Sequence, residues 1–163
     1  MAEQATLEFY KGFCGFSAGH FTIFSKNKRE CLHGHNYSLE AAVTAAIHEP
    51  GMIFDYAYFK NKIQLLCNRL DRRFLLPENS PYLKIVEEDE YYYVSFDEET
   101  IPFLKKDVLL LPIVNTTLEA LSQWFLQEII SNKKFIAGGK ISALVIKVFN
   151  GPEQSAMARW EME

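Results

Sequence analysis

The feature that most constrains the fold is an alternating segment at residues 36–48, in which apolar and polar side chains follow one another. Because successive side chains of a β-strand point to opposite faces, this pattern predicts a strand with one buried face. A strand of this kind belongs to a sheet that is packed on one side. The buried face would carry Tyr37, Leu39, Ala41, Val43, Ala45 and Ile47.

Two helices and several more strands are indicated around this segment. Apolar side chains recur at a spacing of three to four over residues 56–70, which predicts an amphipathic helix. A second helix is expected to begin near Thr116, because Thr116 and Glu119 have the capping-box spacing. Residues 83–96 predict a hairpin, and Ile141–Phe149 is apolar on both faces, as in a central strand. The order predicts an α+β fold with an antiparallel sheet. The remaining strand candidates are an irregular segment at residues 7–24 and a last strand at 155–162, and a short apolar run lies at 108–111.

Length and composition limit the classes of protein that this chain can represent. Its 163 residues suit one domain, over 1–163, and hydrophobic residues make up 48% of it. No apolar run reaches the roughly 18 residues of a membrane span, and the acidic start lacks a signal-peptide core. The net charge of −4 argues against general nucleic-acid binding. The odd number of cysteines predicts reduced thiols in a cytoplasmic protein.

Three of the four histidines lie close together in the sequence. His33 and His35 are two residues apart, so on a strand their imidazoles share a face. His20 follows an earlier strand candidate and can reach that face if the two strands pair. Three neutral imidazoles with an open fourth position form the ligand set of a catalytic zinc. The alternative is a half-exposed pair of histidines, with His20 ending a strand.

The residues around these histidines resemble a known family. The segment FSAGH at residues 16–20, followed by ECLHGHNY at residues 30–37, resembles the 6-pyruvoyl-tetrahydropterin synthase / 6-carboxytetrahydropterin synthase family. The likeness covers nearly the whole chain in order. Its further matches are GMIFDY at residues 51–56, Leu70-Asp71, NTTLE at residues 115–119 and a late strand that ends near Pro152.

The resemblance implies a fold, a metal and an assembly. The metal would be zinc, held by His20, His33 and His35. The fold would be the tunnelling fold, an antiparallel sheet with two helices packed on one face. Such proteins join their sheets into an oligomeric β-barrel, commonly a hexamer built as a dimer of trimers. Glu119 and Asn150 would then complete a site whose zinc belongs to another subunit.

Two residues compete for the catalytic role. Glu30 stands where the Glu-containing type III subfamily has its glutamate, which implies cleavage of 7,8-dihydroneopterin triphosphate to 6-hydroxymethyl-7,8-dihydropterin. A carboxylate beside a zinc can move the required proton if its pKa is suitable; otherwise Glu30 is a loop charge. Cys31 is the alternative base or nucleophile, since a metal and basic neighbours lower a thiol pKa. That alternative implies a 6-pyruvoyl or 6-carboxy tetrahydropterin product.

Five further positions carry over from the resemblance, and two of them are changed. Asp71 matches a catalytic aspartate, but Arg72 follows it where the family has histidine. Arg72 cannot act as a base, and we expect it either to bind the triphosphate or to lie in solvent at a helix end. Asn150 replaces the glutamate that grips the pterin, which removes a charge matched to two donors. The residues expected to contact substrate are thus Thr117, Glu119, Asn150 and Arg72.

A third hypothesis is a zinc-bearing homologue that binds a pterin- or purine-like ligand without turning it over. It is motivated by the missing histidine after Asp71 and by Asn150. A triphosphate substrate, by contrast, needs a funnel for its approach, meaning a local surface of positive charge around the site. The basic residues that could form the funnel, if they converge, are Lys26, Lys28, Arg29, Arg72 and Arg73.

Overall fold

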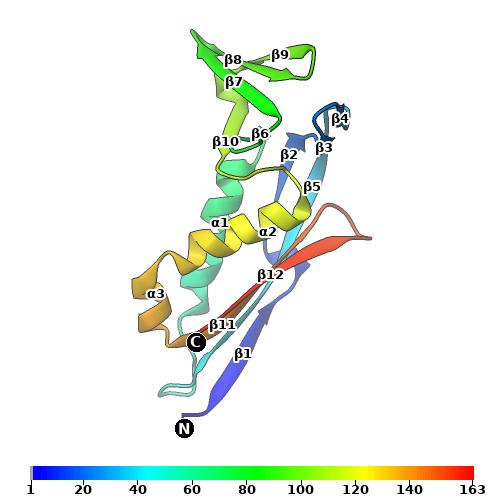
Figure 1. Ribbon diagram of the computed structural model, residues 1–163. Helices are drawn as coiled ribbons and strands as arrows, with labels where there is room; N and C mark the ends of the chain where they lie inside the picture. Colours follow the sequence, from blue (N-terminus) through cyan, green and yellow to red (C-terminus); the bar gives the residue numbers. More distant parts are fainter. Residues whose placement is uncertain (1) are drawn as a thin grey trace.

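The computed structural model describes residues 2–163 and is built around one large twisted sheet (Figure 1). Its strands lie in the order β10-β6-β2-β5-β11-β12, and β1 also pairs with β5. The long strand β5 contains the alternating segment and is the centre of the sheet. The strands are β1 (Gln4–Phe9), β2 (Gly15–His20), β5 (His33–Ala46), β6 (Arg73–Pro77), β10 (Val108–Leu111), β11 (Ile141–Phe149) and β12 (Ser155–Glu161).

The sheet is antiparallel over β1, β2, β5, β11 and β12, as predicted. It differs at β6, which runs parallel to both β2 and β10. No strand was expected at β6, because it follows directly after a helix and ends at Pro77, which suggests a loop. The segment at residues 7–24 is also not one irregular strand, since the short 3-10 helix Lys11–Phe13 separates β1 from β2.

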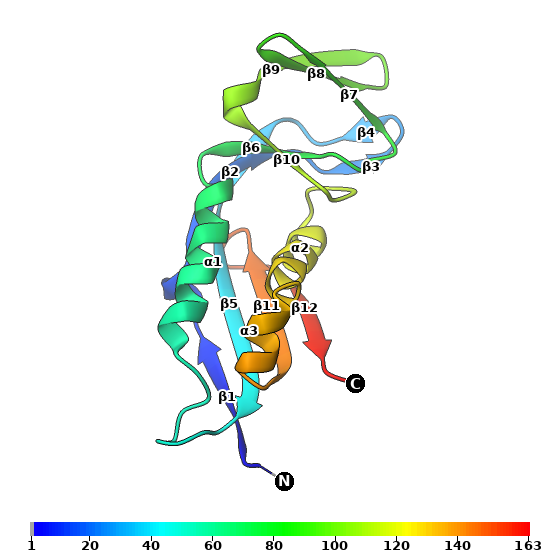
Figure 2. The same cartoon turned by 90° about the vertical axis from the view of Figure 1, so that its left-hand side faces the viewer.

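Two long helices and one short helix cover a single face of the sheet (Figure 2). They are α1 (Tyr56–Leu70), α2 (Leu118–Ile130) and α3 (Lys133–Gly138). The predicted bounds of the first helix are confirmed, and its buried residues include Phe59 and Ile63. These side chains pack on the inward residues of β5, which are likewise removed from water. Within residues 2–163 no helix combines the length and hydropathy that a membrane span requires.

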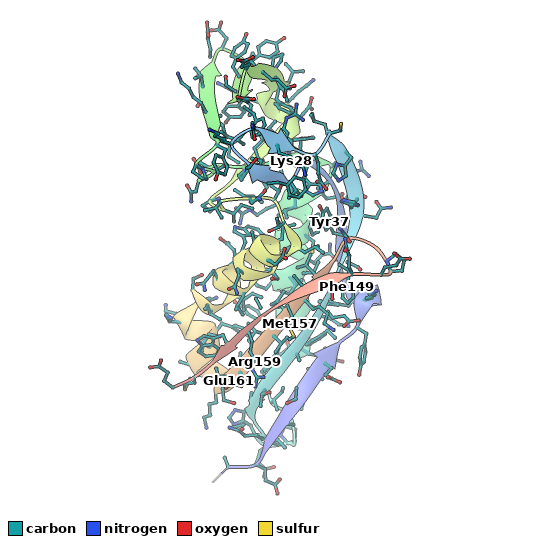
Figure 3. The ribbon with its side chains drawn as sticks, turned by 45° about the vertical axis from the view of Figure 1, so that its right-hand side comes forward. Lys28, Tyr37, Phe149, Met157, Arg159 and Glu161 are labelled. Atoms are coloured by element: carbon teal, nitrogen blue, oxygen red, sulfur yellow. The ribbon has the colours of Figure 1, made fainter. Side chains whose placement is uncertain are left out.

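The other face of the sheet is open. Along β12, Met157, Arg159 and Glu161 lie on this exposed face, whereas Ala158 between them is buried (Figure 3). This alternation is the pattern of a strand with one packed and one solvated face. The sheet of the isolated chain therefore does not close on itself.

Two smaller sheets lie at one end of the molecule. One is the hairpin β3 (Ile23–Ser25) and β4 (Lys28–Arg29). The other is β7 (Leu83–Glu88), β8 (Tyr91–Phe96) and β9 (Glu99–Leu104), which confirms the hairpin over residues 83–96 and adds a third strand. The third strand contains Pro102, which an edge strand tolerates because one row of its N–H groups is unpaired. This end has its own apolar core, formed by Phe21, Ile23, Leu76, Val94, Phe96 and Val108.

The start of α2 differs from the predicted capping box. Thr117 caps the helix, and its hydroxyl accepts a hydrogen bond from the Ala120 N–H at 3.2 Å. Thr116 is fully buried, and its hydroxyl donates to the carbonyl of Phe21 at 2.9 Å. The spacing of Thr116 and Glu119 misled the prediction because two adjacent threonines offer two possible caps, and burial selects the second.

Asp55 caps α1, and this assigns it a structural role. Its Oδ1 accepts from the Ala57 N–H at 2.9 Å. We expect Asp55→Ala to cost about 1 kcal/mol of folding free energy. This corresponds to a loss of about 2–4 °C in Tm for a chain of this size. Asp55→Asn retains an acceptor oxygen and should melt close to the wild type. Thermal unfolding followed by circular dichroism compares them, and equal Tm values for wild type and Asp55→Ala would contradict the assignment.

Candidate metal centre

The pairing of β2 with β5 brings the three histidines together. In this antiparallel register His20 lies opposite His33, and Gly19 lies opposite Gly34. A side chain at Gly34 would not fit, because its Cβ would stand 2.9 Å from the carbonyl oxygen of Ala18. The glycine between the two histidines therefore permits close contact of the strands, and His35 follows on the same face as His33.

The imidazole nitrogens of the three histidines converge on one point. The Nε2 atom of His33 lies 3.1 Å from the Nε2 atoms of both His20 and His35. The three candidate ligand atoms are all within 4.8 Å of one another. A tetrahedral zinc with Zn–N bonds of about 2.0–2.1 Å separates its ligands by about 3.4 Å. The spacing thus fits one metal ion.

Hydrogen bonds on the opposite ring nitrogens fix the imidazole orientation. The Nδ1 of His20 lies 2.8 Å from the carbonyl oxygen of Thr116, and the Nδ1 of His33 lies 2.7 Å from that of Cys31. A carbonyl oxygen only accepts, so each Nδ1 carries the proton and each Nε2 directs a lone pair at the centre. Two lone pairs directed at one point suit a cation, and backbone partners of this kind are usual behind metal-bound histidines.

Two of the histidines, His20 and His35, favour the neutral form that binds metal. Burial lowers the pKa of His20 to about 4. Burial, followed by the neighbouring His33, lowers the pKa of His35 as well. Neutral imidazole is the ligand form, so protons compete weakly for these two residues near neutral pH.

The three histidines lie in a cavity of about 610 Å³. The hairpin β3–β4, the first residues of α2 and the loop between β11 and β12 form its walls. Its volume falls in the range of small-molecule sites. Other residues that line it include Thr22, Glu30, Tyr37, Asn115, Thr117, Glu119, Asn150 and Gln154.

Glu30 lies beside the histidines and is held there. Its Oε2 accepts from the Thr22 N–H at 2.9 Å and stands 3.7 Å from the Nε2 of His33. Burial tends to raise the pKa of Glu30, but the hydrogen bonds from Thr22 and the neighbouring His33 outweigh it and lower the pKa below its usual value. The carboxylate is therefore an acceptor directed toward the metal position.

Cys31 lies outside this cavity. Its side chain is exposed and lines a separate pocket together with Arg29, Phe96 and Glu99. Only its backbone carbonyl contributes to the centre, through His33. The structure places Glu30, and not the Cys31 thiol, with the histidines.

Three of the four expected substrate contacts lie in the histidine cavity. Thr117 and Glu119 reach it from the start of α2, and Asn150 reaches it from the end of β11. Within one chain, Glu119 and Asn150 thus line the same cavity as its own histidines.

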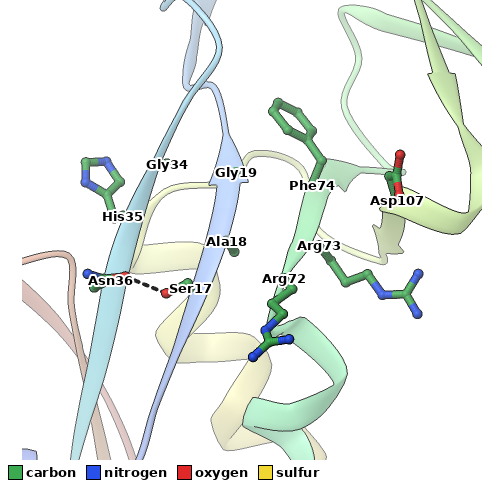
Figure 4. A pocket seen from close by; sticks show the side chains of 10 residues that line it. All are labelled: Ser17, Ala18, Gly19, Gly34, His35, Asn36, Arg72, Arg73, Phe74 and Asp107. Carbon is green, nitrogen blue, oxygen red and sulfur yellow. Dashed lines mark hydrogen bonds between the residues drawn. The ribbon is translucent and has the colours of Figure 1, made fainter.

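Asp71 and Arg72 are not in the histidine cavity, contrary to their expected place. Asp71 is the residue at which α1 ends. Its Oδ1 accepts a hydrogen bond from the N–H of Ser17 in β2 at 2.8 Å. Arg72 lines a second cavity, of about 540 Å³, against the opposite face of β2 and β5 (Figure 4). In that view His35 projects from β5 on the side away from Arg72 and Arg73. His35 lines both cavities, whereas Arg72 and Arg73 line only the second.

The five basic residues do not converge on the histidine cavity. Arg29 pairs with Glu99. Lys28 lines the pocket of Cys31, while Arg72 and Arg73 line the cavity on the other face. No lysine or arginine of residues 2–163 lines the histidine cavity. The predicted funnel for a triphosphate is therefore wrong within a single chain.

Two residues that sequence reasoning did not select are part of the site. Tyr37 lines the cavity and is buried, with its ring 5.6 Å from that of His35 between centroids. Burial raises its pKa, so it remains a neutral phenol. The amide of Asn115 bonds both the N–H and the carbonyl of Ile23 and fixes one wall. The spacing of two from His35 could have indicated Tyr37, and the segment NTTLE at residues 115–119 could have indicated Asn115.

Comparisons with known proteins agree with this geometry. The family model described as 6-pyruvoyl tetrahydropterin synthase matches residues 11–161. A Methanocaldococcus jannaschii protein, provisionally assigned as 6-carboxy-5,6,7,8-tetrahydropterin synthase, is 26% identical over 149 residues. That alignment covers 91% of this chain and 91% of the relative.

Solved structures are similar over almost the full chain. The 6-pyruvoyl tetrahydropterin synthase of Plasmodium vivax is 27% identical, with a TM-score of 0.92 over 98% of this chain and 99% of its own. The Plasmodium falciparum protein of the same name is 26% identical, with a TM-score of 0.91 and the same coverage. Two further P. vivax structures are described as mutants of a catalytic residue, a glutamate changed to cysteine or to alanine.

Proposed function

As a member of the 6-pyruvoyl tetrahydropterin synthase family, this chain belongs among pterin-processing lyases, and we propose that it is zinc-dependent and acts on 7,8-dihydroneopterin triphosphate. The expected product is 6-hydroxymethyl-7,8-dihydropterin, as in the Glu-containing type III subfamily. A 6-pyruvoyl or 6-carboxy tetrahydropterin is the product if Cys31 is the catalytic group instead.

One observation carries this proposal: the Glu30 carboxylate lies 3.7 Å from the Nε2 atom of His33, which is itself 3.1 Å from the Nε2 atoms of His20 and His35. A zinc held by His20, His33 and His35 would supply a Lewis acid that polarises hydroxyls of the substrate side chain. Glu30 would take and return the proton at that side chain. The catalytic glutamate named for the P. vivax relative supports this role.

The cavity also offers groups for binding the pterin ring. The carboxylate of Glu119 can accept hydrogen bonds from ring N–H donors, and Thr117 and Asn150 are polar neighbours in the same cavity. The buried Tyr37 provides an apolar wall with a neutral hydroxyl. These residues would orient the ring so that its side chain meets Glu30.

We also propose that the working protein is a cytoplasmic homo-oligomer, a hexamer built as a dimer of trimers. The open sheet face and the free edge of β12 leave surface for barrel formation. Arg72, with its side chain 91% exposed, would meet the substrate triphosphate only in a neighbouring copy. Size-exclusion chromatography with light scattering tests the assembly.

A product assay tests the function directly. The zinc-loaded protein is incubated with 7,8-dihydroneopterin triphosphate, and pterins are separated by liquid chromatography with mass detection. Formation of 6-hydroxymethyl-7,8-dihydropterin supports the proposal. A 6-pyruvoyl or 6-carboxy product would instead support the alternative in which Cys31 is the catalytic group.

A non-catalytic zinc-bearing homologue that binds a pterin- or purine-like ligand is the second candidate. It is favoured by the position of Asp71 and Arg72 outside the cavity and by the amide of Asn150 within it. Tight pterin binding by the zinc-loaded protein without any product would support this candidate.

Asn150→Glu is expected to strengthen pterin binding. A carboxylate at this position can accept from two adjacent donors, and charge-assisted bonds are roughly twice as strong as neutral ones. We expect an affinity about tenfold higher. Fluorescence titration with neopterin measures it, with Asn150→Gln as the control that keeps an amide. An unchanged or weaker affinity for Asn150→Glu would show that this residue does not face the ring donors.

A further inference from the structure

We propose that Arg29 is a positioning residue that fixes Glu30 at the metal centre and connects it to the small sheet β7–β8–β9. The inference rests on the proposed function, because that function makes Glu30 the acid–base group. Arg29 lines the pocket of Cys31 and not the histidine cavity. Because its guanidinium binds the Glu30 carbonyl, its direct connection to the site runs through Glu30.

The guanidinium of Arg29 joins two parts of the chain that are far apart in sequence. Its Nη1 donates to the carbonyl oxygen of Glu30 at 2.9 Å. Its Nε and Nη2 donate to one carboxylate oxygen of Glu99, at 3.2 and 2.6 Å. Because the guanidinium is planar and rigid, these bonds fix the Glu30 backbone relative to β9.

The surroundings of Arg29 strengthen this connection. Its side chain is only 15% exposed, while that of Glu99 is 60% exposed. The guanidinium carbon lies 5.3 Å from the ring centroid of Phe21 and 5.8 Å from that of Phe96. Phe21 directly follows the metal ligand His20, and Phe96 ends β8. Arg29 thus contacts both the metal-binding strand and the small sheet.

Glu30 needs such support because it belongs to no strand. It lies between the end of β4 and the start of β5. Its remaining hydrogen bonds run to Thr22, whose carbonyl accepts from the Glu30 N–H at 2.9 Å and whose N–H binds the carboxylate at 2.9 Å. Among residues 2–163, none of β7, β8 or β9 lines the histidine cavity. The small sheet packs on Phe21 and Ile23 through its apolar core, and its hydrogen-bonded connection to Glu30 runs through Glu99 and Arg29.

The variant Arg29→Met tests the inference, because it removes the charge and the donors but keeps an unbranched apolar side chain. The main readout is amide hydrogen exchange by NMR in the zinc-loaded protein. The Thr22 N–H is bound by the Glu30 carboxylate, so its exchange rate reports whether Glu30 is in place. We expect exchange at Thr22 to become about tenfold faster. The Ser17 N–H, bound by Asp71 at 2.8 Å, is the internal control and should not change.

The kinetic readout is a fall in kcat with KM nearly unchanged. We expect kcat of Arg29→Met to drop about tenfold, because a displaced acid–base group slows the chemical step and not binding. Arg29→Lys keeps the charge without the planar fork and should not restore the rate. The matched control is Glu87→Gln, which breaks an exposed ion pair with Lys105 (2.6 Å) on the same small sheet and should alter neither readout.

The outcomes separate this inference from the proposed function. Unchanged exchange at Thr22 in Arg29→Met overturns the inference, and so does equal acceleration at Thr22 and Ser17, which indicates general loosening. Wild-type behaviour of Arg29→Lys overturns it too, since charge alone would then suffice. If wild-type protein forms no product, or Glu30→Gln is fully active, the proposed function fails, and exchange at Thr22 still decides whether Arg29 positions Glu30.

Discussion

Replacing His33 with alanine is expected to strip the metal from the protein and to stop turnover. Its Nε2 is 3.1 Å from both other Nε2 atoms, so its loss leaves two ligands and an open side. Loss of an outer hydrogen-bond partner already weakens metal binding by about 10–100-fold, and loss of a ligand should exceed that. The missing Lewis acid should lower the rate about 1000-fold or more.

Metal content after dialysis, measured by mass spectrometry, checks this result beside the rate. His33 is partly exposed, so the variant should stay folded, which circular dichroism verifies. His48 provides the matched control, because it forms a β-bridge with Met52 and is not part of the cluster. His48→Ala should keep its zinc. A His33→Ala protein that retains a full equivalent of zinc would disprove the metal centre.

Glu30→Gln is expected to abolish most turnover while leaving the metal in place. The amide has nearly the same shape but cannot take a proton, and removal of a general acid–base group costs about 10²–10⁴-fold in rate. Since Glu30 lies 3.7 Å from His33 and is not itself one of the clustered ligands, zinc content should match the wild type. Single-turnover kinetics with the zinc-loaded protein measures the effect on the chemical step.

Two controls accompany Glu30→Gln. Glu98→Gln makes the same chemical change at an exposed glutamate outside the histidine cavity and should be fully active. Cys31→Ala separates the two candidate catalytic groups and should also retain activity, because its thiol faces the other pocket. Loss of turnover in Cys31→Ala alone, with Glu30→Gln active, would reverse the assignment.

The sequence predicted those helices and strands that are set by the periodicity of their own residues. The helix at residues 56–70 and the strand around Leu39 follow from periodicity, and both are found where expected. The strand β6 was missed because its burial depends on lying between β2 and β10, a long-range pairing that no short pattern shows. The cap of α2 was misplaced for the same reason, since only the packed structure decides that Thr116 is buried.

The residues of the candidate site likewise fall into those that the sequence indicated and those that only the folded structure brought together. A spacing of two on a strand places His33 and His35 on one face whatever surrounds them, so the sequence identified this pair, whereas His20 joins them only through the pairing of β2 with β5. The tertiary structure alone decided which other groups join them. It brought Glu30, Glu119 and Asn150 to the histidines and placed Arg72 in the second cavity, because these residues lie in loops or at helix starts, whose positions depend on long-range packing.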